Sequence, residues 1–349
     1  MKKSSKLLGL LLALCMVVAL AAPTAFAAEP AADAAYDLTD CKPVKITFPI
    51  TNAPEYLETK CTETWMDLVT ERSNGLITFD YTNGGALGTQ MELLEGIQYG
   101  TYDLSIIDLA NFSEFVPAAK VLGMPCLIKD YDHADKIFSG EVFEWLQKIM
   151  EENSNILVLN TYYCGFRYVF SNKDVSTLEN CKGILIRSPQ VELYTDTLGM
   201  LGFSTVAMSF PECYTGMSTG IIDAIEQPLQ PIYTNGFYEL GKEILCTRHF
   251  LSTNHIIANK DFWNGLPEVY RDIMLDAMAE VQPEQWQGCK DAENGFVEKL
   301  EAEGVVFHEF TEEDRATVDE MFYQYWIDKC GELGDEVIGI LDTVIALSK

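Results

Sequence analysis

Apolar and polar residues alternate along several short stretches of the chain, and apolar patterns of helical period follow them. Residues 44–48 alternate as in a β-strand, and residues 57–68 then place apolar side chains every three to four positions. The dipeptide Asn74-Gly75 predicts a turn, after which residues 77–81 alternate again. The N-terminal part of the chain therefore begins with a strand, a helix and a second strand.

A capping box follows this first unit. Thr89 and Glu92 have the spacing with which two side chains close the start of a helix, and Gly100 is placed to end that helix. The next alternating stretch is YDLSIID, which ends at Asp108. Strands that alternate with helices in this way are typical of an open α/β sheet.

The same pattern starts again after Gly165 and predicts a second α/β unit. A further capping box, Ser209 to Glu212, opens a helix that Gly220 closes. The other expected elements are strands at 168–172, 183–188, 204–208 and 221–227 and a helix that begins at Pro189.

The C-terminal third is mainly helical after one more strand near 255–260. Residues 267–303 form a helical tract that would extend roughly 50 Å if uninterrupted, which is longer than one lobe is wide. Pro283 lies inside it and is expected to kink or split it. A last helical region begins near the cap Thr311-x-x-Asp314. Because no low-complexity linker separates the two α/β units, we expect them to exchange segments.

The first 27 residues read as a secretory signal peptide: lysines, a short apolar run and the small-residue site Ala25-Phe26-Ala27. The apolar run is too short for a comfortable membrane span, so a retained anchor is the less favoured alternative. Cys15 lies inside this run after a bulky leucine, which leaves lipid attachment as a minor alternative. Residues 28–42 are rich in alanine and predict a flexible leader.

Charge narrows the range of partners. The net charge is −29, and removal of a signal peptide with three lysines and no acid lowers it to −32. So acidic a protein is a poor partner for nucleic acid or an anionic membrane surface. It also repels anionic ligands at long range, so an anion would need a local basic site.

Cysteine and histidine patterns indicate no cofactor or metal. The mature chain keeps nine cysteines, an odd number without a CxxC pair, so most are expected to be buried small apolar residues and not bridges. The four histidines lack metal-ligand spacing, and no glycine-rich nucleotide loop is present. We expect neither cofactor nor metal.

The pentapeptide GMSTG, which contains Ser218, fits the GxSxG pattern of serine hydrolases. That nucleophile elbow requires a strand before the serine and a helix after it. Here a capped helix precedes Ser218 and a strand follows, so the end of a helix at Gly220 is the better interpretation. We therefore expect no enzyme, and an exported serine hydrolase remains an unfavoured alternative.

Two arginines stand at strand ends in the second unit, Arg167 in GFRY and Arg187 in GILIRSP. In an open α/β sheet, ligands bind in the crevice at the carboxyl ends of strands. A guanidinium group matches a carboxylate with two parallel hydrogen bonds. From this motif alone, a ligand site and a structural ion pair with one of the 53 acids are about equally favoured.

The spaced motifs GFRY, GILIRSP, SFPECY, TGIID and EQP resemble the signature region of the solute-binding proteins of TRAP transporters, the tripartite ATP-independent periplasmic transporters. The stretches GGALGTQMELLEGIQYGTYDLSIID and STNHIIANKDFWNGLP are similar to other segments of that family. The resemblance covers about residues 44–310 and involves many spaced elements.

This resemblance implies a role for each candidate site residue. Arg187 would hold the substrate carboxylate through a bidentate salt bridge, Arg167 would be a second cationic contact, and Phe210 would pack on the ligand. The remaining wall residues would be Asp108, Asn111 and Gln190. The triplet EQP departs from the family's ENP at Gln227, whose longer amide would shift the usual hydrogen bond to the ligand.

The family resemblance also implies a fold and partners. We expect a two-lobed periplasmic-binding-protein-like α/β fold with interdigitated lobes and a long lobe-spanning helix. Lobe I would contain 43–164 and about 253–292, and lobe II 165–252 and about 293–349. The expected protein is an exported monomer in the periplasm or on the outer face of the cytoplasmic membrane. It would deliver an organic acid to a small and a large TRAP subunit for sodium-coupled uptake. A receptor for a membrane sensor remains an alternative.

Overall fold

The computed structural model describes residues 36–349. The predicted signal peptide, 1–27, and most of the predicted leader, 28–42, lie outside this range, and residues 36–43 form neither helix nor strand. Among residues 36–349, no helix combines the length and apolar character needed to cross a bilayer.

The first α/β unit follows the predicted order. Its elements are β1 (Val44–Pro49), α1 (Leu57–Arg72), β2 (Ile77–Thr82), α2 (Gln90–Gln98), β3 (Leu104–Asp108), η1 (Leu109–Glu114), η2 (Pro117–Gly123), α3 (Tyr131–Phe138), α4 (Glu141–Asn153) and β4 (Ile156–Val158). The predicted capping box is present at the start of α2, where Thr89 accepts a hydrogen bond from the backbone N–H of Glu92 at 3.3 Å and returns one to its carboxylate. Strands β1 and β2 pair in parallel.

The second unit also follows the predicted order, with several shifted boundaries, the largest at β5, which begins six residues before the predicted strand. Its elements are β5 (Tyr162–Ser171), η3 (Glu179–Cys181), β6 (Leu185–Ser188), α5 (Glu192–Met200), β7 (Ser204–Ala207), η4 (Phe210–Glu212), α6 (Cys213–Ser218), β8 (Ala224–Pro228), α7 (Leu229–Thr234), η5 (Phe237–Glu239) and β9 (Glu243–Leu245). Helix α5 begins at Glu192 and not at Pro189, because Val191 still has an extended backbone. Strand β8 begins at Ala224 because the turn at Gly220, with φ of 75°, continues through the next residues.

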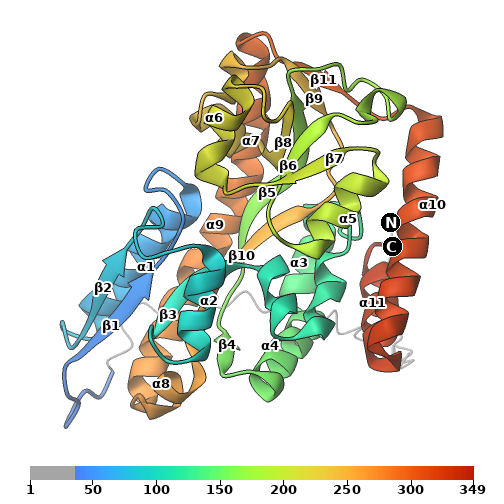
Figure 1. Cartoon of the computed structure of the whole chain (residues 1–349). Helices are drawn as coiled ribbons and strands as arrows, with labels where there is room; N and C mark the ends of the chain where they lie inside the picture. Colours follow the sequence, from blue (N-terminus) through green and yellow to red (C-terminus); the bar gives the residue numbers. More distant parts are fainter. Residues whose placement is uncertain (1–35) are drawn as a thin grey trace, which may run out of the picture. The chain divides into compact units, whose positions relative to one another are not determined.

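The C-terminal third returns to the first unit before it ends in helices. Its elements are β10 (Leu251–Asn259), α8 (Lys260–Gly265), α9 (Glu268–Ala302), β11 (Val306–His308), α10 (Glu312–Leu333) and α11 (Asp335–Leu347). Figure 1 shows α9 alongside β5, and α11 beside α10 and α3.

Two strands join the units into one sheet system. The order of the larger sheet is β11-β9-β5-β8-β6-β7, and β10 pairs with β3, β4 and β5. The first half of β5, up to Phe166, pairs with β10, whereas the second half, from Arg167, pairs with β8 and β9. At this change of partner, Gly165 has φ of 102°, and the register of β10 shifts between Ser252 and Thr253. The expected exchange of segments in a two-lobed α/β fold is confirmed.

Helix α9 runs for 35 residues through Pro283, so of the expected kink or split the split does not occur. Proline removes one backbone hydrogen bond, and tertiary bonds immediately after it hold the helix against β5. The side-chain amide of Gln285 bonds to both backbone groups of Tyr163, at 2.9 and 2.6 Å. The indole of Trp286 donates to the carbonyl of Thr161 at 2.7 Å.

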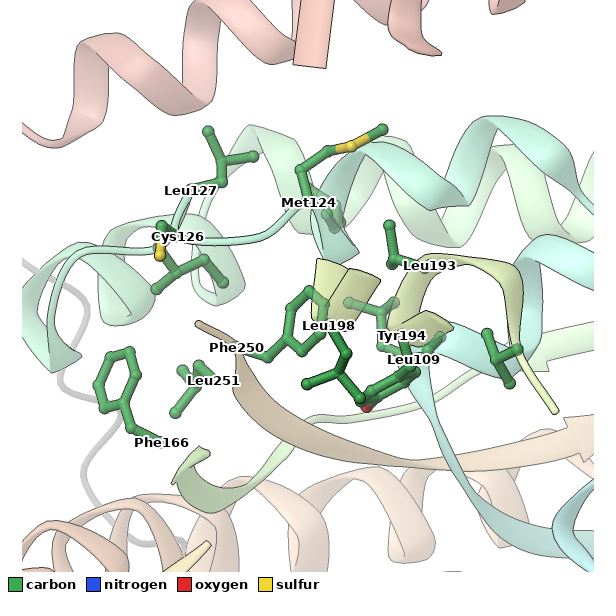
Figure 2. Packing of buried hydrophobic residues seen from close by; sticks show 14 of the residues in the cluster. Leu109, Met124, Cys126, Leu127, Phe166, Leu193, Tyr194, Leu198, Phe250 and Leu251 are labelled. Carbon is green, nitrogen blue, oxygen red and sulfur yellow. The ribbon is translucent and has the colours of Figure 1, made fainter. Parts of the chain in front are cut away.

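The hydrophobic core is continuous across the two units near the end of β3. Figure 2 shows Leu109 and Met124 from the first unit beside Leu193 and Tyr194 of α5. A Cβ atom on Gly123 would approach a methyl group of Leu193 to 2.8 Å, so the backbone of the first unit lies directly on α5. The two units are therefore in close contact on this side of the site.

The C-terminal helices also tie the units together. The indole of Trp326 in α10 donates to the carbonyl of Pro125 at 2.8 Å, while Tyr325 of the same helix donates to Asp196 of α5 at 2.9 Å. Helix α11 packs against α3 and α4, and a ring nitrogen of the buried His133 lies 2.8 Å from the carbonyl of Val344. Residues of the segment assigned to lobe II thus contact lobe I, and the exact lobe boundaries stay a prediction.

Candidate functional site

Arg187 is a buried cation without a carboxylate partner in the described part of the chain. It lies near the end of β6, and only 6% of the residue is exposed. Its Nε donates to the carbonyl of Met208 at 2.8 Å, whereas its two terminal nitrogens bond to no described residue. Its guanidinium carbon lies 5.9 Å from the ring centroid of Phe210. Burial lowers the pKa of Arg187, as expected for a charge that has left water.

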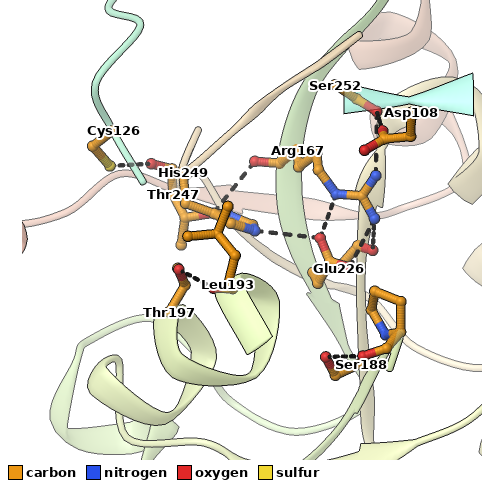
Figure 3. A network of polar contacts seen from close by, with 11 residues as sticks. Asp108, Cys126, Arg167, Ser188, Leu193, Thr197, Glu226, Thr247, His249 and Ser252 are labelled. Atoms are coloured by element: carbon orange, nitrogen blue, oxygen red, sulfur yellow. Dashed lines mark hydrogen bonds and ion pairs between the residues drawn. The ribbon is translucent and has the colours of Figure 1, made fainter. Parts of the chain in front are cut away.

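Arg167 has the opposite environment, although it is equally buried, with 6% exposure. Its Nε lies 2.5 Å from one carboxylate oxygen of Glu226, and its Nη2 lies 2.7 Å from the other. Nη2 also donates to the Glu226 carbonyl at 3.0 Å, and Nη1 donates to the hydroxyl of Ser252 at 3.4 Å. Figure 3 shows this bidentate pair. The ion-pair alternative therefore describes Arg167 and not Arg187.

A third buried residue completes the pair. Nε2 of His249 lies 3.3 Å from the Glu226 carboxylate, and its Nδ1 lies 2.7 Å from the hydroxyl of Thr247. Burial lowers the pKa of His249, so the imidazole is neutral near pH 7. Burial alone would raise the pKa of Glu226, but Arg167 and the hydrogen bond to His249 outweigh it and lower that pKa to about 2. Glu226 is thus ionised and neutralises Arg167.

Asp108 is a further member of this hydrogen-bond network. Its carboxylate accepts from the backbone N–H of Ala110 at 2.9 Å and from the hydroxyl of Ser252 at 3.2 Å. Ser252 therefore bridges Asp108 to Arg167. Burial raises the pKa of Asp108, and the charge of Arg167 opposes this shift. The side chain is half-buried, and it lines a cavity of about 20 Å³ together with Tyr194 and Phe250.

Asn111 is oriented by a neighbouring amide. Its Nδ2 donates to Oε1 of Gln90 at 3.0 Å, and that oxygen also accepts from the backbone N–H of Asp108 at 2.9 Å. The amide nitrogen of Gln90 makes no hydrogen bond to a residue between 36 and 349, so it can donate to another partner.

The remaining predicted residues lie around Arg187 and make fewer contacts. Phe210 is half-buried beside the guanidinium, and Gln190 is exposed. Gln227 is half-buried in β8. Since Ile186 pairs with Ala224, strand alternation places Gln227 on the face of the sheet that carries Arg187. Neither glutamine side chain bonds to another residue of the described range.

Several residues that the sequence analysis did not name belong to this constellation: Glu226, Tyr194, His249, Ser252 and Gln90. The ring of Tyr194 lies 5.0 Å from the guanidinium of Arg167. Glu226 had a usable signal, because an acid inside the apolar strand AIEQP requires a buried cation. Nothing in the local sequence marks the others.

Ser218 does not have the setting of a hydrolase nucleophile. It is the last residue of the six-residue helix α6, is exposed, and donates to the carbonyl of Thr215 at 2.9 Å. The order of helix and strand around it is the reverse of a nucleophile elbow. In addition, no group of three His, Cys, Asp or Glu residues suited to a metal ion occurs between residues 36 and 349. All nine cysteines of that range are free thiols, and six of them are buried.

Comparison with known proteins gives consistent matches. The sequence model of the bacterial extracellular solute-binding proteins, family 7, matches residues 48–330. The sialic acid-binding periplasmic protein SiaP of Vibrio cholerae is 27% identical over 239 residues, which are 68% of this chain and 74% of that protein. The C4-dicarboxylate-binding periplasmic protein DctP of Rhodobacter capsulatus is 25% identical over 307 residues, or 87% and 92% of the two chains.

A solved structure agrees with these sequence matches. The TRAP periplasmic solute-binding protein from Desulfovibrio salexigens, crystallised with orotic acid, is 26% identical and superposes with a TM-score of 0.80. The match covers 86% of this chain and 98% of the other. The likeness therefore includes nearly the whole described fold.

Proposed function

Because the chain belongs to the bacterial extracellular solute-binding proteins, family 7, we propose that it captures a small organic acid on Arg187 and delivers it to a TRAP transporter. The observation that carries this proposal is the buried guanidinium of Arg187, whose terminal nitrogens bond to no described residue. A buried charge without a partner is costly, and a ligand carboxylate would supply the missing partner. SiaP, DctP and a 2,3-diketo-L-gulonate-binding relative support an acidic ligand.

Ligand entry requires the first and the second α/β unit to move apart. The cavity beside Asp108 has a volume of about 20 Å³, which holds about one or two water molecules and no organic acid. The receptor would open at the partner change in β5 and close with the ligand between Arg187 and the wall formed by Asp108, Asn111 and Gln190. Phe210 and Gln227 would complete the carboxylate end of the site.

The remaining parts of the proposal concern the partners. The closed receptor would dock, as an exported monomer, on a small and a large membrane subunit, and a sodium gradient would drive uptake. The strong negative charge of the chain makes nucleic acid an unsuitable partner.

A thermal-shift screen of organic acids, followed by calorimetry, tests this function. Arg187→Ala should weaken the best ligand by about a hundredfold to several thousandfold, since a buried ion pair that loses one member costs roughly 3 to 5 kcal/mol. Arg315→Ala is a matched control, because Arg315 also lies over an aromatic ring, 5.0 Å from Phe310, but on the far helix α10. Equal affinity of the wild type and Arg187→Ala for every ligand found would refute the proposal.

A further inference from the structure

Four charged side chains lie around Tyr194. Two of them form a neutral ion pair, and the other two are single charges. Burial raises the pKa of Tyr194, and the charges of Arg167, Asp108, Glu226 and Arg187 all act on it. Arg167 and Glu226 cancel each other through their bidentate contact. What remains is one cation at Arg187 and one carboxylate at Asp108.

Arg167 has no free fork for a second ligand carboxylate. Of its five N–H groups, Nε and both hydrogens of Nη2 are directed to Glu226, and one hydrogen of Nη1 is directed to Ser252. At most one N–H is left, which can support a single hydrogen bond but not the two parallel bonds of a carboxylate clamp. His249, the other nitrogen base of this network, faces Glu226 and is neutral.

Asp108, at the end of β3, presents an acceptor. The Asp108 carboxylate receives two protein hydrogen bonds, and a carboxylate has about four lone-pair positions, so about two remain free toward the cavity. Both protein bonds are donated to Asp108, which is the arrangement expected for a carboxylate that accepts. A ligand group that contacts Asp108 must therefore donate a hydrogen bond, and a second carboxylate at that position would face a like charge.

From this arrangement we infer the class of the ligand: an acid with a single carboxylate, which binds Arg187, and a hydroxyl or ammonium group that donates to Asp108. Acids with a second carboxylate at the far end are rejected. This inference rests on the proposed function, since it assumes that Arg187 holds the ligand carboxylate. It adds to that function the residue, Asp108, that would discriminate between organic acids.

Matched pairs of acids test the inference. D-gluconate and D-glucarate differ only in a terminal alcohol that becomes a carboxylate, and 4-hydroxybutyrate and succinate form a shorter pair. Calorimetry on the chain without its predicted signal peptide would measure both members of each pair, together with further hydroxy acids, amino acids and their diacid counterparts. For any pair that binds through Arg187, the monocarboxylate should bind at least about a hundredfold more tightly.

Substitution of the acceptor sharpens the test. Asp108→Asn keeps the oxygen that accepts from the backbone N–H of Ala110 but removes the negative charge. The ratio of monocarboxylate to dicarboxylate affinity should therefore fall by about tenfold or more. Asp132→Asn, an exposed acid on α3, should leave the preference unchanged.

The possible outcomes separate the two proposals. A diacid that binds through Arg187 as tightly as its monocarboxylate counterpart, or a preference that Asp108→Asn leaves intact, would overturn this inference and leave the receptor function standing. If no acid of either kind bound in an Arg187-dependent way, the receptor function itself would fail, and the inference with it.

Discussion

Arg167 and Arg187 lie on the two strands that flank β8, and both are equally buried, yet within residues 36–349 only Arg167 has a carboxylate partner. Arg167 is held by Glu226 on two nitrogens, whereas the one bond of the Arg187 side chain to a described residue goes to a backbone carbonyl. The charge of Arg167 is compensated within the fold, so removal of Glu226 would leave it buried and unpaired. The charge of Arg187 has no carboxylate partner among residues 36–349, and under the proposed function a ligand carboxylate would compensate it.

The largest effect is expected from removing the partner of Arg167. Glu226→Ala leaves a buried guanidinium uncompensated and should lower the free energy of unfolding by roughly 3 to 5 kcal/mol, measured by urea denaturation at pH 7. The control is Glu309→Ala, which removes the exposed partner of Arg248 and should cost less than about 1 kcal/mol. Equal losses of unfolding free energy in the two variants would show that the buried Arg167–Glu226 pair matters no more for stability than the exposed Arg248–Glu309 pair.

Acid should reveal the same difference through pH. The pKa of Glu226 is about 2 in the folded chain, below the ordinary 4.5, so its contribution is complete above pH 4.5 and is lost as the pH falls toward 2. The stability advantage of the wild type over Glu226→Gln should therefore shrink by about 2 kcal/mol between pH 5 and pH 3. Urea midpoints at several pH values would measure this, and a constant gap would contradict the ionised pair.

Removal of the unpaired arginine should affect stability much less. Arg187→Met replaces an uncompensated charge with an apolar side chain of similar length, so the unfolding free energy without ligand should change by no more than about 1 kcal/mol, with an increase the more favoured direction. Arg167→Met is the matched comparison and should be several times more destabilising, because it leaves the buried carboxylate of Glu226 without its cationic partner. Similar destabilisation by both substitutions would remove the distinction between the two arginines.

The smallest effect concerns the aromatic neighbour of Arg187. Phe210→Leu removes a cation–π contact of about 0.5 kcal/mol and should weaken ligand binding about two- to threefold. Phe310→Leu removes a similar contact from Arg315 outside the site and should leave calorimetric affinity unchanged. A loss of more than tenfold for Phe210→Leu would mean that the ring contacts the ligand more extensively than the arginine.

The elements of the fold were largely predictable because their signals are local. Alternation located β1, β2 and β3, and both capping boxes are present at the predicted helix starts. The local rule for proline was insufficient where tertiary contacts hold a helix together. Pro283 does not split α9, since Gln285 and Trp286 anchor the helix to β5.

The site was predictable only in part. Both arginines stood out in the sequence, but only Arg187 lies near a strand end, since Arg167 is in the middle of β5. Their different partners depend on sheet register. Glu226 meets Arg167 across 59 residues because β8 pairs with β5, and no spacing in the sequence indicates that pairing. For the same reason, Tyr194 and His249 could not be assigned to the site from the sequence. The family membership is confirmed, whereas the roles of the candidate residues stay predictions.

The contacts of α10 and α11 with the first α/β unit have a consequence for how the chain folds. Trp326 bonds to the carbonyl of Pro125 across 201 residues, and His133 contacts Val344 across 211. Contacts this distant in sequence form slowly, because a long segment of chain must be closed before they stabilise anything. During synthesis, the first α/β unit would wait for the last helices to emerge before its packing is complete. A chain that stops before α10 is therefore expected to remain loosely packed in its N-terminal half, far from the cut.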